Sequence, residues 1–477
     1  MRPIFTLTKN IFSLFTARAI DILCRLVVIA IVTRYLGVEE YGEYAFAGTF
    51  VVFFVLLTNM GVEEILTREI AKSPGDEGRM LSGAMSIRLV LIPLTTAAYL
   101  AVAFSMNVSG MVIKAICISV FAQIFLSFIN LFFSVFRGME KMEYEPAVGL
   151  LINIMLVPAI VVIARFDLGF LSIFHANLLA HVLAATVLFF FITWKLKDHI
   201  LRLNLTLGRQ LLLSGYPLGI SALLLAASFH VDIFVLRFLR DASEVALFQL
   251  PYQIIFRLLI IPMSLVSAVF PALSRLAKAT GNEKTELRDP VTQGYRLLLI
   301  ISMLTCLLLT NLSNEIILIM GGPHFSGAVI SLQILAWSTI FLFGDFLQSM
   351  TLVALNRQRL LVIQNIASLA LNLFLDLVLI PFYGYIGACV ATLVAFIIRF
   401  VIGLAFVDRS LGGISIYPTV FKIAVSGSAA AVFMLLFSGW NAFFSSFGGV
   451  LVFLLVIVMT KSLSFSELRV FSQMMRP

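Results

Sequence analysis

Long apolar runs recur along the whole chain, each of the length that a membrane-spanning helix needs. About 20 consecutive apolar residues cross the hydrocarbon core of a bilayer. We find fourteen such runs, separated by polar connections, at residues 11–34, 44–66, 82–105, 112–136, 146–165, 169–194, 211–238, 245–270, 294–319, 328–355, 360–381, 385–407, 418–438 and 446–463. The ninth run is interrupted at Asn311–Asn314. The pattern predicts an all-α polytopic membrane protein with about 14 transmembrane helices.

Three charged side chains interrupt the first apolar run. Arg18, Asp21 and Arg25 fall within about 60° around an α-helix, so they form one polar stripe. Each charge at the bilayer centre costs roughly 2.5–3.5 kcal/mol on insertion scales. We therefore expect the stripe to face a water-filled cavity or partner helices instead of lipid. In the alternative interpretation, Asp21 only neutralises the two arginines at i,i+3 and i,i+4 spacing and fixes helix contacts.

Composition agrees with a membrane protein and narrows its chemistry. The chain is 61% hydrophobic and 12% charged, against roughly 25% charged residues in soluble domains. Its net charge of +8 does not indicate a nucleic-acid partner, because basic residues of membrane proteins collect in cytoplasmic loops. The four cysteines lie far apart in apolar runs without metal-ligand spacing. With no phosphate loop, HExxH or GxSxG motif, we expect neither an enzyme nor a metal site nor a resident cofactor.

The basic residues also predict the orientation of the chain. With the N-terminus in the cytoplasm, six of the 33 lysines and arginines lie within spans, and most of the others fall on the inner side. The predicted outer side carries only Arg34, Lys114, Arg165 and Arg240. Since positive residues accumulate in cytoplasmic loops, we expect a multi-pass protein of the inner (cytoplasmic) cell membrane with both termini cytoplasmic.

Weak sequence similarities between the two halves of the chain indicate an internal repeat. Residues 34–44 and 237–247 each begin with Arg, an aromatic residue and Leu at the end of a span, and the fifth and eleventh spans hold the mid-helix asparagines Asn153 and Asn372. Six spans return the chain to its starting side, so spans 1–6 and 7–12 read as two parallel copies around a central cavity, a transporter architecture. We expect an N-lobe at 1–205, a C-lobe at 206–410, and two extra C-terminal helices with a cytoplasmic tail at 411–477.

Other charges within spans have more than one interpretation. Arg257 lies in the eighth span with no acid near it in sequence, which favours contact with a ligand. Asp232, two residues after His230, either binds a coupling ion, shuttles a proton or pairs with an arginine across the bundle. We expect four further charged residues either to form ion pairs within one lobe or to extend from helix ends toward water: Arg88, Asp345, Asp376 and Arg399.

Four short motifs on these spans resemble one family. They begin at Arg34 (RYLGVEEYGEY), Phe136 (FRGMEKM), Phe270 (FPALSRL) and Tyr385 (YIGACVAT). The first is similar to the R-x-LG-x-x-x-YG-x-Y element after the first span of polysaccharide flippases in the MATE-like (MOP) transporter superfamily. The others resemble the elements that end the fourth and eighth spans and open the twelfth. The resemblance covers about residues 8–460.

The resemblance implies a flippase for oligosaccharide repeat units carried on a polyprenyl diphosphate, as in O-antigen or exopolysaccharide synthesis. Relatives place cavity cations on the first, second and eighth spans; Arg18, Arg25 and Arg257 match the first and eighth, whereas the second span has no basic residue. Asp21 and Asp232 are then the candidate cavity acids or ligands of a coupling Na⁺ or H⁺. The implied partners are the lipid-linked oligosaccharide, the bilayer, and a glycan polymerase or other polysaccharide-assembly proteins.

Three other functions remain open. A flippase for lipid II differs from this interpretation only in its cargo. A MATE-like antiporter of small cationic molecules needs a cavity dominated by acids, whereas the predicted cavity is mixed to basic. A membrane glycan polymerase or ligase usually carries a large outward loop with catalytic residues, and every predicted outward loop here is short.

Overall fold

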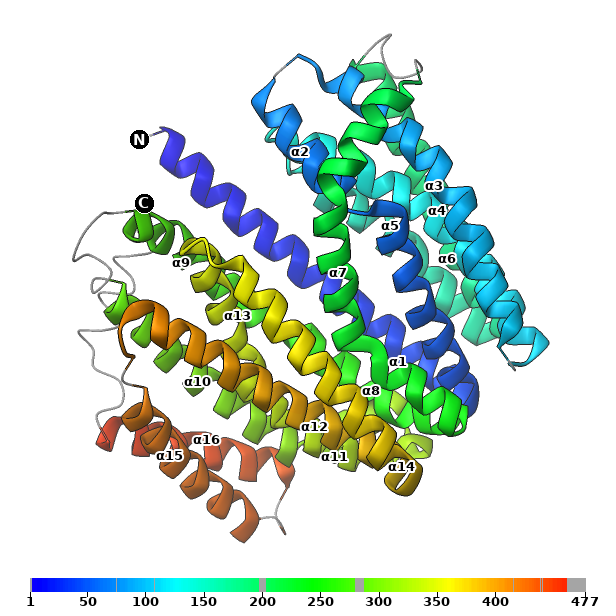
Figure 1. Cartoon of the computed structure of the whole chain (residues 1–477). Coiled ribbons are helices and arrows are strands. Elements are labelled where there is room, and N and C mark those ends of the chain that lie inside the picture. The colour runs from blue at the N-terminus through cyan, green and yellow to red at the C-terminus, as the bar shows by residue number, and fades with distance from the viewer. Residues whose placement is uncertain are drawn as a thin grey trace. The chain divides into compact units, whose positions relative to one another are not determined.

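The computed structural model describes the backbone of residues 2–73, 75–106, 108–196, 203–278, 287–414, 416–437, 439 and 441–460. It describes side chains from Ile20 onward in these ranges, apart from residues 196, 267–268, 271–272 and 274–278. Within these ranges the regular structure is helical (Figure 1). The chain forms two compact units, Met1–Ile233 and Phe234–Pro477, which we describe in turn.

Ten described helices are long and apolar enough to span a membrane, and two bent helix pairs raise that number to twelve. Two very long helices, α1 (Arg2–Asn59) and α14 (Gln358–Leu411), each contain a glycine with non-helical dihedral angles. These are Gly37, with φ of 73°, and Gly384, with φ of 57°. Glycine adopts such positive φ angles without steric cost, so each long helix consists of two helices joined at the glycine. The resulting multi-pass membrane protein is consistent with the fourteen predicted spans.

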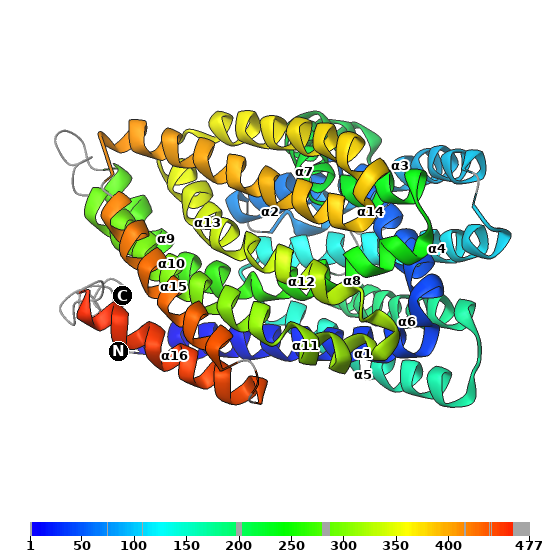
Figure 2. The ribbon, with the colours of Figure 1, turned by 90° about the horizontal axis from the view of Figure 1, so that it is seen from below.

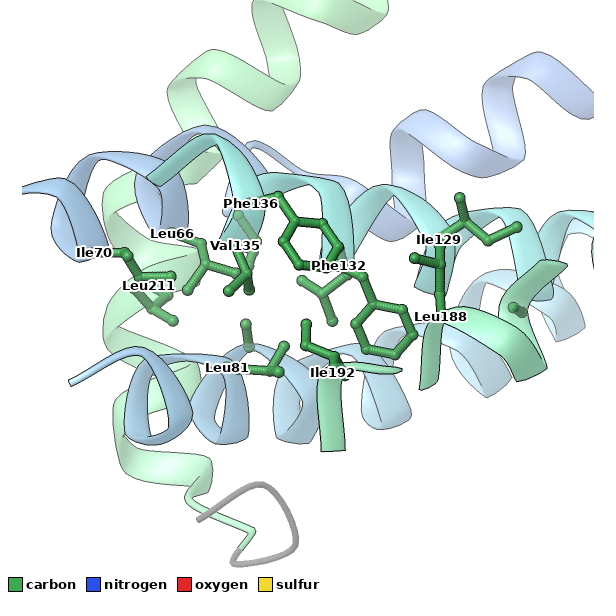
Figure 3. Packing of buried hydrophobic residues seen from close by; sticks show 14 of the residues in the cluster. Leu66, Ile70, Leu81, Ile129, Phe132, Val135, Phe136, Leu188, Ile192 and Leu211 are labelled. Atoms are coloured by element: carbon green, nitrogen blue, oxygen red, sulfur yellow. The ribbon is translucent and has the colours of Figure 1, made fainter. Parts of the chain in front are cut away.

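The first unit comprises α1, α2 (Val62–Lys72), α3 (Glu77–Ser105), α4 (Gly110–Gly138), α5 (Tyr144–Phe166), α6 (Phe170–Leu196) and most of α7 (Leu205–Leu239). A buried apolar cluster joins α2, α3, α4 and α6 (Figure 3). Phe132 and Phe136 of α4 pack there with Leu66 of α2, Leu81 of α3 and Leu188 of α6. Two helices of this cluster, α3 and α4, also pack against α1.

A break between α1 and α2 brings the backbone close to α7. The two helices meet at 43° across Met60 and Gly61, whose φ angles are 44° and 77°. A Cβ added at Gly61 would lie 2.0 Å from the carbonyl oxygen of Gly215 on α7. One added at Gly219 would lie 2.6 Å from backbone atoms of Met60. Small residues allow such backbone contact between membrane helices, and here they dock the first part of α7 on the first unit.

The second lobe was predicted to begin at residue 206, at the start of α7. The compact units divide later, within α7, between Ile233 and Phe234. The glycine contacts of α7 with the α1–α2 break agree with this division, because they lie in the part of α7 that groups with the first unit. The lobe boundaries themselves stay a prediction.

The second unit contains α8 (Ala242–Leu258), α9 (Ile260–Lys278), α10 (Arg288–Asn311), α11 (Ser313–Gly321), a 3₁₀ turn η3 (Pro323–Phe325), α12 (Ala328–Ala336), α13 (Ser338–Ala354), α14, α15 (Tyr417–Leu436) and α16 (Ala442–Met459). The interruption expected at Asn311–Asn314 is confirmed, because α10 ends at Asn311 and α11 begins at Ser313. The last two helices lie side by side and α15 packs on α10 (Figure 2). Asn311 Nδ2 donates to Ser445 Oγ and Ser446 Oγ of α16 over 2.9 and 2.8 Å.

One contact in the first unit joins the end of its first span to the turn between its fifth and sixth. Tyr35 Oη donates to Asp167 Oδ1 over 2.9 Å and accepts from the Gly169 backbone N–H over 2.7 Å. Gly169 has φ of 87°, so the turn requires a residue that tolerates the left-handed region. The side chain at the end of span 1 therefore holds the turn that precedes span 6.

The second unit has a corresponding contact. Arg240, just after α7, donates to the carbonyl oxygen of Pro381 over 2.7 Å, and Glu244 accepts from the Tyr385 backbone N–H over 2.8 Å. Both side chains thus hold the bend of α14 at Gly384. The elements in contact occupy the same places in spans 7–12 as Tyr35 and Gly169 do in spans 1–6, which supports the predicted internal repeat.

Candidate functional site

An ion pair lies on the first helix where the sequence predicts a polar stripe. Arg25 Nε is 2.9 Å from Asp21 Oδ2, one helical turn away on α1. The side chains are 53% and 34% exposed, respectively. The helix places residues four apart on one face, so the predicted pairing of Asp21 with Arg25 is present.

The other oxygen of Asp21 is held by α5. Asn153 Nδ2 donates to Asp21 Oδ1 over 2.9 Å, although the two residues are 132 positions apart in the chain. Asn153 lies in the middle of α5, which packs against α1, and is only 5% exposed. The sequence shows Asn153 as an asparagine in the middle of a span, at a place repeated by Asn372, and predicts no role for it at the site. A polar amide within an apolar span was the signal that could have found it.

The guanidinium of Arg25 keeps its terminal nitrogens available. Among the described residues, its one hydrogen bond runs from Nε to Asp21, and half of the side chain is exposed. A guanidinium stays charged in proteins and offers a planar fork of donors that fits phosphate and carboxylate oxygens. This arrangement can bind an oxyanion without first breaking the pair with Asp21.

The two remaining predicted cations are Arg18 and Arg257. Arg18 falls on α1, but its side chain lies outside the described residues. Arg257 belongs to the second unit and lies in the last turn of α8, partly buried. Because α8 ends at Leu258 and α9 begins at Ile260, Arg257 lies beside a helix break within one span. A cation in the last turn of a helix is favoured by the helix dipole.

Asp232 and His230 both lie on α7 but are not brought together as a pair. Asp232 is buried. The ring of His230 instead lies edge-on to Phe53 of α1, with 6.3 Å between the ring centroids. Residues two apart on a helix point about 200° away from each other. A direct His230–Asp232 proton relay is therefore not favoured by the geometry.

Lobe-internal pairing is confirmed for Arg88. Its Nη2 is 2.9 Å from Glu63 Oε1 of α2, and its Nη1 donates to Ser127 Oγ of α4 over 2.8 Å. Arg88 is 1% exposed, so this pair belongs to the interior of the first unit.

The second unit has its own buried pair, so Asp345 and Arg399 take the lobe-internal pairing that was one of the two expectations for them. Arg399 Nε lies 3.0 Å from Asp345 Oδ2, and Gln364 Nε2 donates to Asp345 Oδ1 over 2.8 Å. Asp376 is also buried and accepts from Asn372 Nδ2 over 3.2 Å within α14. The Asp345–Arg399 pair and Gln364 join α13 to α14, whereas the Asn372–Asp376 hydrogen bond lies within α14.

Two known protein families have models that match most of the chain. The profile of the family described as polysaccharide biosynthesis protein matches residues 7–277, and that of the MatE family matches residues 217–378. A probable low-salt glycan biosynthesis flippase of Haloferax volcanii is 26% identical over 174 residues. That alignment spans only 36% of this chain and 36% of the relative.

A flippase and a transporter are among the solved structures of similar fold. The lipid II flippase MurJ, in an inward closed conformation, has a TM-score of 0.78 at 17% identity, with 94% of this chain and 98% of that chain covered. An inward-facing multidrug resistance MATE transporter of the MOP superfamily has a TM-score of 0.63 at 14% identity, with 83% and 98% covered. At these identities the likeness establishes the fold alone.

Proposed function

The chain belongs to the polysaccharide biosynthesis protein family, and on that premise we propose that it is a flippase for polyprenyl-diphosphate-linked oligosaccharide units. It moves them from the cytoplasmic to the outer leaflet by alternating access, for surface polysaccharide synthesis. The curated relative that supports a glycan cargo is itself described as a probable glycan biosynthesis flippase.

The observation that carries the proposal is the half-exposed Arg25 on α1. A cation within an apolar span costs several kcal/mol to insert, so such residues usually serve a substrate or ion pathway. Among the described residues, Arg25 makes one hydrogen bond, from Nε to Asp21, and its other donors remain available for an oxyanion. A diphosphate is the oxyanion that a polyprenyl-linked glycan presents.

The physical needs of this cargo match the fold. The sugar head cannot cross hydrocarbon, the diphosphate needs cationic donors, and the polyprenyl tail can stay in lipid. Arginine suits the diphosphate because its planar fork makes bidentate contacts. In this proposal Arg18, Arg25 and Arg257 are cations for the diphosphate, while Asp21 and Asp232 serve as cavity acids or as ligands of a coupling Na⁺ or H⁺.

Complementation of glycan export tests the proposal. A strain that lacks its own flippase receives the wild-type chain, Arg25→Ala, Arg257→Ala or the double variant, and surface glycan is measured together with protein level in the membrane. We expect each single variant to lower export about tenfold or more, the size of a lost charge-assisted hydrogen bond. Full export by the double variant at normal protein level contradicts the diphosphate contact.

The matched control is Arg165→Ala. Arg165 is an exposed arginine in the last turn of α5, away from the Asp21–Arg25 pair in sequence. Its loss should leave export unchanged, so a decrease specific to Arg25 and Arg257 separates a role in transport from a general effect of removing positive charge.

Lipid II is the second candidate cargo, because the fold likeness to MurJ covers nearly that whole chain. Both cargoes carry a polyprenyl diphosphate and differ in the head group. Rescue of a strain depleted of its lipid II flippase, without rescue of surface glycan, would favour lipid II. A glycan polymerase and other assembly proteins are the proposed partners if surface glycan is restored.

A further inference from the structure

We infer that Asn153 is a positioning residue, which acts through Asp21 to fix the Arg25 guanidinium for an incoming diphosphate. This inference rests on the proposed function and adds to it a residue on a different helix. Its basis is the chain of two contacts, Asn153 Nδ2 to Asp21 Oδ1 and Asp21 Oδ2 to Arg25 Nε, each 2.9 Å long.

The ion pair needs an anchor outside its own helix. An exposed i,i+4 pair contributes little by itself, because two flexible side chains lose rotamer entropy to hold one geometry. Asp21 and Arg25 are both substantially exposed. Asn153 is buried within α5, so packing limits its side chain. The amide therefore transfers the rigidity of the α1–α5 interface to the carboxylate of Asp21.

The direction of each hydrogen bond explains why an asparagine fits here. Both oxygens of Asp21 accept, one from Asn153 and one from Arg25. The amide donates without adding charge, so it does not compete with Arg25 for the carboxylate as a lysine would. An acid at position 153 would instead face Asp21 with like charge.

Holding Arg25 by Nε orients the rest of the fork. With Nε–H directed at Asp21, the end of the planar guanidinium formed by its two terminal nitrogens makes no other hydrogen bond among the described residues and can meet an oxyanion. A preoriented fork loses less entropy when it makes a bidentate contact with phosphate oxygens. Asn153 should therefore change the affinity for a diphosphate without touching it.

A double-mutant cycle on the full-length protein in lipid nanodiscs tests this positioning. The probe is undecaprenyl diphosphate, and its Kd is measured for the wild type, Asn153→Ala, Arg25→Ala and the double variant. We expect Asn153→Ala to weaken binding about five- to tenfold, the size of one lost hydrogen bond. In the Arg25→Ala background the same change should have no further effect, because the group it positions is gone.

Two further variants separate positioning from general damage. Asn372→Ala removes the asparagine at the equivalent place in the second copy of the repeat. Asn372 is buried and donates to Asp376 within its own helix. This variant should leave the Kd for undecaprenyl diphosphate unchanged. Asn153→Asp preserves size but loses the donor, and we expect it to weaken binding at least as much as Asn153→Ala.

The outcomes distinguish the two proposals. An equal loss from Asn153→Ala with and without Arg25, or an unchanged Kd in both Asn153 variants, overturns the positioning role and leaves the flippase proposal intact. Wild-type protein that does not bind the probe, or binding that is unaffected by Arg25→Ala, overturns the proposed diphosphate contact itself and with it the role of Asn153.

Discussion

Arg88 of α3 and Glu63 of α2 form an ion pair inside the first unit, with 2.9 Å between Nη2 and Oε1. Their side chains are 1% and 12% exposed. Ser127 of α4 accepts a second hydrogen bond from the same guanidinium. The ion pair and the hydrogen bond to Ser127 together join α2, α3 and α4 directly after the α1–α2 break.

Replacing Arg88 with Met should destabilise the protein by about 3 kcal/mol or more, because it leaves the carboxylate of Glu63 buried without its cation. The double variant Arg88→Met with Glu63→Gln should recover much of this loss, since no unpaired charge remains. Thermal unfolding of the purified protein in one detergent measures both. Equal destabilisation by the single and double variants would contradict this explanation.

The glycine contact between α7 and the α1–α2 break gives a second prediction. A methyl group at Gly215 would lie 2.5 Å from the Gly61 carbonyl oxygen, whereas one at Gly48 on α1 would meet nothing within 4 Å. Gly215→Ala should therefore separate the helices and reduce folded protein in the membrane severalfold. Gly48→Ala should be neutral or stabilise by up to about 1 kcal/mol, because alanine favours helix. Similar yields for the two variants, measured by fluorescence-detected size-exclusion chromatography, would argue against the close contact.

The bend of α14 gives a third prediction with its own control. A Cβ at Gly384 would lie 2.1 Å from Glu244 Oε2, which accepts from the Tyr385 backbone N–H. Gly412 also has a positive φ, of 75°, but has open space around it. Gly412→Ala should cost about 1 kcal/mol of backbone strain. Gly384→Ala should cost clearly more, because its ψ of −136° lies outside the left-handed helical region and because the Glu244 contact is lost. The melting temperatures of the two variants measure this difference, and equal values would contradict a tight bend at Gly384.

The sequence predicted those parts of the fold that depend on local pattern. Apolar runs of span length mark the helices, and the break at Asn311–Asn314 is visible as polar residues in such a run. The pairing of Asp21 with Arg25 was also predictable, because helical geometry alone places residues four apart together.

Contacts between distant segments could not be predicted in the same way. The sequence does not indicate which residues of α1 and α5 face each other. Asn153 is therefore recognisable in the sequence only as a polar residue in an apolar span. Glu63 lies at the break after α1, and its partner Arg88 is 25 residues away. The docking of α7 on the first unit depends on the facing glycines, and single glycines in apolar spans carry no information on what they face.

Transport of a defined cargo tests the central claim most directly. The wild type, Arg25→Ala and Arg165→Ala are reconstituted into liposomes, and the outward movement of a fluorescent glycosyl undecaprenyl diphosphate is followed by quenching from outside. We expect the wild type and Arg165→Ala to flip the lipid at the same rate and Arg25→Ala to be slower by about tenfold or more. Equal rates for all three proteins, at equal amounts in the liposomes, would contradict the role of α1 in carrying a diphosphate-linked glycan.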